Sequence, residues 1–176
     1  MAIGQGYVTA TPLQMAQAAA TIATGTRYRP QLVQRIEAPD GTVLRTSAPE
    51  QVAQLPVRKT ALAQVQAALA DVVNTGRGTG KHAALPGITV AGKTGTAQVI
   101  TLGHERVAAQ KLPWQQRDHA WFVAYAPADD PAIAVATLVE HAEGGGGAVA
   151  APATRALLES FFQLRDEREH VRYAEN

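Results

Sequence analysis

Apolar residues recur at helical spacing in two stretches of the first half of the chain. The first stretch begins at Thr11-Pro12-Leu13-Gln14, where Thr11 can cap a helix and Gln14 completes a capping box, and it ends at Gly25. The second stretch begins at Thr60 and ends at Asn74-Thr75-Gly76. The apolar face of this second stretch consists of Leu62, Val65, Leu69, Val72 and Val73. Both stretches predict amphipathic helices.

Other stretches have the composition of strands. Residues 32–37 and 42–46 flank Pro39-Asp40-Gly41, which predicts a small hairpin. Three further strands, rich in β-branched and aromatic residues, are predicted at 88–100, 119–126 and 133–141. The short link between the last two favours antiparallel pairing.

The chain ends in a predicted helix followed by a charged tail. The helix covers residues 151–164 and offers Leu157, Leu158, Phe161 and Phe162 for packing. Residues 165–176 alternate in charge, which predicts a solvated, flexible tail. The order of elements predicts an α+β fold for residues 1–164, in which helices pack on an antiparallel sheet.

Composition narrows the class of protein. The 176 residues are 46% hydrophobic and 18% charged, as expected for one globular domain. A net charge of +1 gives no electrostatic reason to expect nucleic acid or a membrane surface as a partner. The chain has no cysteine, so disulfides and thiolate metal sites are excluded. No apolar run approaches the roughly 20 residues of a membrane span, and no signal sequence begins the chain.

The most informative stretch is Ala91-Gly92-Lys93-Thr94-Gly95-Thr96-Ala97-Gln98. Together with Gly87 it matches the phosphate-loop pattern G-x-x-x-x-G-K-[ST], which makes a nucleotide-binding protein one hypothesis. A phosphate loop requires a strand before its first glycine and a helix at its lysine. Leu85-Pro86 precede Gly87, and the residues after Lys93 are a poor helix start. The context therefore disfavours nucleotide binding. A second glycine cluster, 76–81, follows a helix rather than a strand and is interpreted as a helix cap and flexible connection, with a substrate-side loop as the alternative.

Lys-Thr-Gly on a strand has another use. Lys93 would supply positive charge at the edge of a cleft, and the hydroxyls of Thr94 and Thr96 would bind a substrate carboxylate. The Thr96 amide would form one half of an oxyanion hole. Gly95 would allow the substrate backbone to approach closely. The alternative is an ordinary strand lysine beside a bulge, and the tripeptide alone leaves the two interpretations level.

The neighbouring motifs favour the cleft. The stretch 91–98, followed by Asp118-His119-Ala120-Trp121-Phe122-Val123-Ala124-Tyr125-Ala126-Pro127, resembles the penicillin-binding proteins, in particular class B peptidoglycan transpeptidases of the penicillin-binding protein 2 type. The resemblance extends to 3–16, 134–140 and 150–152 and so covers nearly the whole chain. It implies the fold of penicillin-binding proteins and serine β-lactamases. It also implies that Lys93 and Thr96 are catalytic, that 93–96 bind substrate, and that no cofactor is needed.

The serine motifs of that family have no counterpart in this sequence. The family requires a Ser-x-x-Lys motif, whose serine is acylated, and a Ser-x-Asn motif. Neither of the two serines, Ser47 and Ser160, lies in such a motif. The sequence therefore resembles the C-terminal part of a transpeptidase domain. We expect it to form no acyl-enzyme alone, because covalent catalysis needs an activated nucleophile.

Metal binding and aromatic contacts are secondary hypotheses. His104, Glu105, Asp118, His119, His141 and Glu143 suggest zinc, but their spacing fits no known zinc pattern, and we expect no metal. By resemblance the link 101–117 overhangs the cleft, where Trp114 would touch substrate. Trp121 and Phe122 are expected in the core.

The resemblance also implies partners and a location for an intact parent protein. Its partners would be peptidoglycan stem peptides and β-lactams, at the periplasmic face of the inner membrane. The strand 133–141 is apolar on both faces, which is typical of a central strand. Without a neighbour it would pair with a second copy or with the missing N-terminal part, or the isolated chain would be poorly folded. A non-catalytic binding module and a serine β-lactamase or carboxypeptidase relative stay open as alternatives.

Overall fold

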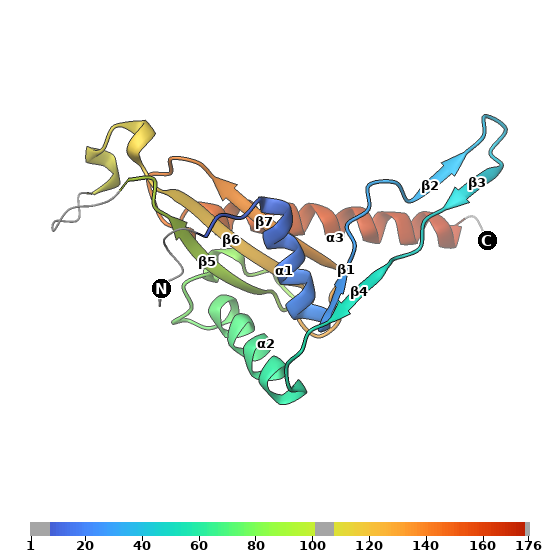
Figure 1. Ribbon diagram of the computed structural model, residues 1–176, viewed down its shortest axis with the longest axis horizontal. Coiled ribbons are helices and arrows are strands. Elements are labelled where there is room, and N and C mark those ends of the chain that lie inside the picture. The colour runs from blue at the N-terminus through green and yellow to red at the C-terminus, as the bar shows by residue number, and fades with distance from the viewer. Residues whose placement is uncertain (1–7, 101–107, 175–176) are drawn as a thin grey trace.

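An antiparallel sheet of order β5-β6-β7 forms the centre of the molecule (Figure 1). It appears in a computed structural model that describes residues 8–100 and 108–174. The strands are β5 (Ala91–Ala97), β6 (His119–Ala126) and β7 (Ile133–Val139). Their register is regular throughout. The three predicted strands and the antiparallel pairing of the last two are confirmed, although β5 and β7 are shorter than the predicted 88–100 and 133–141.

Helices cover the sheet on both faces (Figure 1). On one face, α3 (Ala150–Ala174) packs against β6 and β7. On the other, α1 (Pro12–Thr24) packs against β6 and β7, and α2 (Lys59–Asn74) packs against β5. The predicted α+β class is thus confirmed.

The two early helices begin and end close to their predicted residues. The Thr11 hydroxyl accepts from the Gln14 N–H at 3.2 Å, and the Thr11 N–H donates to Gln14 Oε1 at 2.8 Å. This is the predicted capping box. Gly25 ends α1 with a φ of 72°, a conformation that glycine adopts readily. Helix α2 begins at Lys59 without a side-chain cap and ends before Thr75.

Two small strand pairs lie outside the central sheet. The predicted hairpin is confirmed by β2 (Arg35–Glu37) and β3 (Val43–Thr46), which project from the body of the molecule (Figure 1). The second pair, β1 (Thr26–Tyr28) with β4 (Gln51–Gln54), was not predicted from the sequence. Such short strands carry little periodic signal, and their pairing joins residues far apart in the chain.

The main core lies between the sheet and α3. Its fully buried side chains include Phe122, Leu158 and Val90, and Val73 from the last turn of α2 belongs to the same core. The hydroxyls of Thr137 on β7 and Thr154 on α3 lie 2.7 Å apart, so the polar groups buried at this contact satisfy one another. The prediction for Phe122 is confirmed, whereas Trp121 is only half-buried.

The last helix is longer than the sequence predicted. It continues past Leu164 to Ala174, so the backbone of the predicted flexible tail is helical there. The side chains of 165–168 are exposed, as expected for a solvated segment. None of the helices in the described part of the chain combines the length and apolar character of a membrane span.

Candidate active site

The Lys-Thr-Gly motif lies on an edge strand. Strand β5 pairs with β6 on one side, and no other described strand pairs with it. Lys93 and Thr96 are exposed on this strand, and Thr94 and Gly95 are half-buried. The register from 91 to 97 contains no bulge, so Lys93 does not lie beside one, and its role in a site stays a prediction.

Lys93 and Thr94 meet at the free edge of β5. Lys93 Nζ lies 2.9 Å from the Thr94 carbonyl oxygen and 3.2 Å from the Thr94 hydroxyl oxygen. Successive side chains on a strand point to opposite faces, so this contact requires the lysine to curl around the strand edge. The ammonium and the hydroxyl therefore form one polar group on the accessible side of the strand.

The glycine-rich connection after β7, residues 144–147, packs against the backbone of β5 and β6. A side-chain carbon at Gly146 would lie 2.0 Å from the Trp121 carbonyl oxygen and 2.8 Å from that of Gly95. A side chain at Gly95 would itself crowd Trp121 Cβ, at 3.1 Å. The contacts at Gly146 are too short to allow a side chain, whereas the contact at Gly95 would be tight. Gly146 thus allows the connection after β7 to pack closely against the motif strand and its neighbour.

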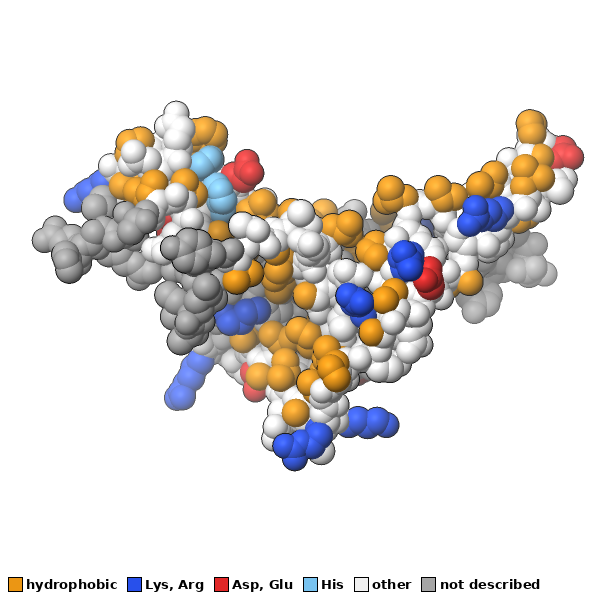
Figure 2. All heavy atoms as spheres, viewed as in Figure 1, with side chains coloured by type: hydrophobic (Ala, Val, Ile, Leu, Met, Phe, Trp, Pro, Cys, Tyr) orange, Lys and Arg blue, Asp and Glu red, His pale blue; other side chains and the backbone are white. Residues whose placement is uncertain are grey.

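An apolar hollow lies next to Lys93. It has a volume of about 220 Å³ and is enclosed by α1, α2 and the first two strands of the sheet. Its lining includes Met15, Ala19 and Ile22 from α1, Val65 and Leu69 from α2, and Ala91, Lys93 and Tyr125 from the sheet. Figure 2 shows hydrophobic side chains gathered over α1 and α2 on this face. The motif therefore borders an apolar surface of a kind suited to packing against further protein.

Tyr125 is the one unsatisfied buried side chain among the described residues. It is 1% exposed, lines the hollow, and its hydroxyl has no hydrogen-bond partner. Burial raises the pKa of this hydroxyl above its ordinary value, because the charged form is poorly solvated. A buried hydroxyl without a partner is costly and therefore rare.

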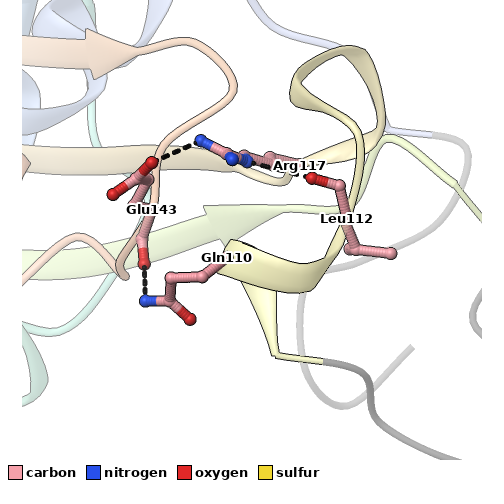
Figure 3. A network of polar contacts seen from close by, with 4 residues as sticks. All are labelled: Gln110, Leu112, Arg117 and Glu143. Carbon is pink, nitrogen blue, oxygen red and sulfur yellow. Dashed lines mark hydrogen bonds and ion pairs between the residues drawn. The ribbon is translucent and has the colours of Figure 1, made fainter.

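The connection before β6 is fastened to the connection after β7 (Figure 3). Arg117 Nη1 lies 2.6 Å from Glu143 Oε1, and the Arg117 side chain is only 17% exposed. Gln110 Nε2 donates to the Glu143 carbonyl oxygen at 3.1 Å, and Arg117 Nε donates to that of Leu112 at 3.3 Å. Nearby, the Trp114 ring packs on His141 at 4.5 Å. These contacts order residues 110–117, and the predicted contact of Trp114 with substrate stays a prediction.

Two alternative chemistries find no support in the described residues. Lys93 lies within a strand, and no helix begins there, so the structure contradicts the phosphate-loop hypothesis. Of the zinc candidates, His104 and Glu105 lie outside the described residues. The described part of the chain contains no group of three or more acidic or histidine side chains that could hold a metal.

Sequence reasoning gave too little weight to Thr79. Its hydroxyl oxygen lies 3.2 Å from that of Thr94, which places the turn 75–80 beside the motif. The glycine cluster at 76–81 was assigned mainly to a helix cap, and the pattern Gly78-Thr79-Gly80 was the available signal for a site residue. The contact spans 15 residues and cannot be read from local periodicity.

Comparisons with known proteins agree with this architecture. Residues 1–159 match the family model "Penicillin binding protein transpeptidase domain". The chain is 42% identical to the peptidoglycan D,D-transpeptidase PbpA of Mycolicibacterium smegmatis over 89% of its length, and 38% identical to MrdA of Haemophilus influenzae over 93%. Among solved structures, an imipenem acyl-enzyme of penicillin-binding protein A from M. tuberculosis matches 91% of the chain, with a TM-score of 0.70 and 35% identity.

The fold, the edge-strand motif and these matches define an α+β domain of the penicillin-recognising class. More particularly, the chain belongs to the penicillin-binding protein transpeptidase domain family, and its relatives are of the penicillin-binding protein 2 type. It spans 30% of the M. smegmatis relative and 25% of the H. influenzae relative. The predicted family and fold are thus confirmed.

Proposed function

We propose that this chain supplies the Lys-Thr-Gly wall of a peptidoglycan D,D-transpeptidase, a serine acyl-transferase that crosslinks stem peptides. The observation that carries this proposal is the joint position of Lys93 and Thr94 at the free edge of β5. An ammonium and a hydroxyl presented together suit a substrate carboxylate and the charge that develops during acyl transfer.

This placement and the family resemblance support the following roles for the four motif residues. Lys93 provides positive charge near the reacting centre, and Thr94 binds the substrate carboxylate. Gly95 has no side chain and so lets the substrate backbone approach the strand; its close packing against Trp121 supports this role. Thr96 contributes its amide to the oxyanion hole and its hydroxyl to substrate binding. Lys93 and Thr96 act as the catalytic residues of this wall.

We further propose that the nucleophile comes from a segment outside this sequence. The serines of this chain, Ser47 and Ser160, lie in no Ser-x-x-Lys or Ser-x-Asn motif. Solved relatives are nevertheless acyl-enzymes with penicillin G and imipenem. The intact protein would act on stem peptides, bind β-lactams and lie on the periplasmic face of the inner membrane.

The test is a hybrid in which this chain replaces the matching part of M. tuberculosis penicillin-binding protein A. We expect a labelled penicillin to acylate the hybrid at one serine contributed by the M. tuberculosis part. The chain alone should not be labelled. A folded hybrid that is not acylated, or labelling of Ser47 or Ser160 in the chain alone, would contradict the proposal.

The free edge of β7 carries a second part of the proposal. Among described strands β7 pairs with β6 alone, and its residues are apolar on both faces, as in a central strand. An unpaired edge is a template for another strand. We expect the isolated chain to self-associate through this edge or to pair with the remaining part of the domain. A concentration-independent monomer in sedimentation, with strong amide protection across 133–139, would contradict this.

A further inference from the structure

We propose that Thr79 is a positioning residue that directs the Thr94 hydroxyl toward the substrate carboxylate. This inference rests on the function proposed above and adds a residue outside the Lys-Thr-Gly motif. The two hydroxyl oxygens lie 3.2 Å apart, and Thr94 also contacts Lys93 Nζ at 3.2 Å. Thr94 is therefore the middle member of a polar chain of three side chains.

The donors and acceptors available in this row of three side chains determine whether the Thr94 hydroxyl can donate to a substrate. A threonine hydroxyl has two acceptor positions and one hydrogen to donate, whereas an ammonium can only donate. If Thr79 donates to Thr94, both acceptor positions of Thr94 are filled, by Thr79 and by Lys93. The single hydrogen of Thr94 is then left for an external acceptor. An anionic carboxylate favours this arrangement over the reverse one, and accepted hydrogen bonds strengthen a hydroxyl as a donor.

The backbone around Thr79 is held on two sides. In the turn after α2, the Gly78 N–H donates to the Thr75 carbonyl at 3.0 Å, and the Gly80 N–H donates to the Val72 carbonyl at 2.9 Å. On the other side, a side-chain carbon at Gly147 would lie 2.2 Å from the Thr79 carbonyl oxygen. Fixed packing of this kind presents the Thr79 hydroxyl with little entropic cost, as a positioning residue requires.

The role of Thr79 is tested by comparing acylation by a penicillin that has a free carboxylate with acylation by its methyl ester. In the hybrid protein, Thr79→Val removes the hydroxyl with little change of shape, and Thr79→Ser keeps it. The quantities to measure are the acylation rate constants with penicillin G and with its methyl ester, which lacks the anionic acceptor. We expect Thr79→Val to slow acylation by the acid by up to about tenfold, the upper end of the effect of losing one hydrogen bond between neutral groups. The ester rate should change less than about twofold, and Thr79→Ser should resemble the wild type.

A double-mutant cycle separates positioning from a general structural effect. In a Thr94→Val background, Thr79→Val should cause no further loss, because its target hydroxyl is absent. Equal slowing of acid and ester, an unchanged rate for Thr79→Val, or an additive loss in the Thr94→Val background would overturn the inference while the proposed function stands. A folded wild-type hybrid that is not acylated at all would overturn both.

Discussion

The two faces of the central sheet differ in how completely the chain covers them. On the α3 face, Leu158 and Phe122 are fully buried, and the hydroxyl of Thr154 has partners. On the face of α1 and α2, an apolar hollow remains, and the buried Tyr125 hydroxyl has no partner among the described residues. One face is a finished core, and the other has the properties of an interface.

The difference bears on function because Lys93 lines the unfinished face. In the proposed function the motif is one wall of a site and borders this apolar hollow, and acyl transfer also needs a nucleophile opposite the electrostatic groups. We infer that the same surface that binds the rest of the domain brings the nucleophile toward the motif. Packing and catalysis are then completed by one docking event.

The largest expected effect is on stability. In the isolated chain, Leu158→Ala should lower the free energy of unfolding by about 3 kcal/mol, because it opens a cavity in a fully buried site. Leu69→Ala, at the half-buried wall of the hollow, should cost less than about half of that. Urea titrations of the two variants measure this difference. Equal losses would mean that both faces are equally well packed.

Loss of the Lys93 charge should raise the free-energy barrier to acylation by nearly as much. In the hybrid, Lys93→Ala should slow acylation by penicillin about a hundredfold, because it removes an electrostatic group aimed at the reacting centre. Lys59→Ala, at the exposed start of α2, is the matched control and should leave the rate unchanged. A near-normal rate in folded Lys93→Ala would make Lys93 a structural residue.

Tyr125→Phe should have opposite effects in two contexts. In the isolated chain it removes an unpaired buried hydroxyl and should raise the free energy of unfolding by about 1 kcal/mol. In the hybrid we expect the docked protein to give the hydroxyl a partner, so the same change should lower stability by a similar amount. Denaturant titrations of both proteins provide the comparison. The same sign in both would show that the hollow offers the hydroxyl no partner.

The smallest expected effect is a pH dependence. Burial raises the pKa of Tyr125 above its ordinary value of 10.0, so above pH 10 the folded chain keeps a proton that the unfolded chain releases. Stability should therefore fall as the pH rises through this range and be unaffected below it. Between pH 9.5 and 10.5 the wild type should therefore lose more stability than Tyr125→Phe, which has no hydroxyl to titrate. Parallel stability curves for the two proteins would contradict the assigned cause.

Local patterns predicted the parts of the fold that local physics determines. The capping box at Thr11, the hairpin turn at Asp40-Gly41 and the strands β6 and β7 carry their signals within a few residues. The motif 93–96 was also predicted, by resemblance. The β1–β4 pair, the Gly146 contact behind the motif and the Thr79–Thr94 contact were missed. Each joins residues distant in sequence, and no periodic pattern encodes such contacts.

The most direct test of the account is acylation in trans. The chain is mixed with a separately produced M. tuberculosis penicillin-binding protein A from which the matching part has been removed, and labelled penicillin is added. The account predicts serine labelling that requires both proteins. Ala18→Arg, at an exposed position lining the hollow, should abolish it, whereas Ala67→Arg, at an exposed α2 position outside the lining, should not. Labelling that survives Ala18→Arg unchanged, or no labelling from a mixture that forms a stable complex, would contradict the claim that this face completes the site.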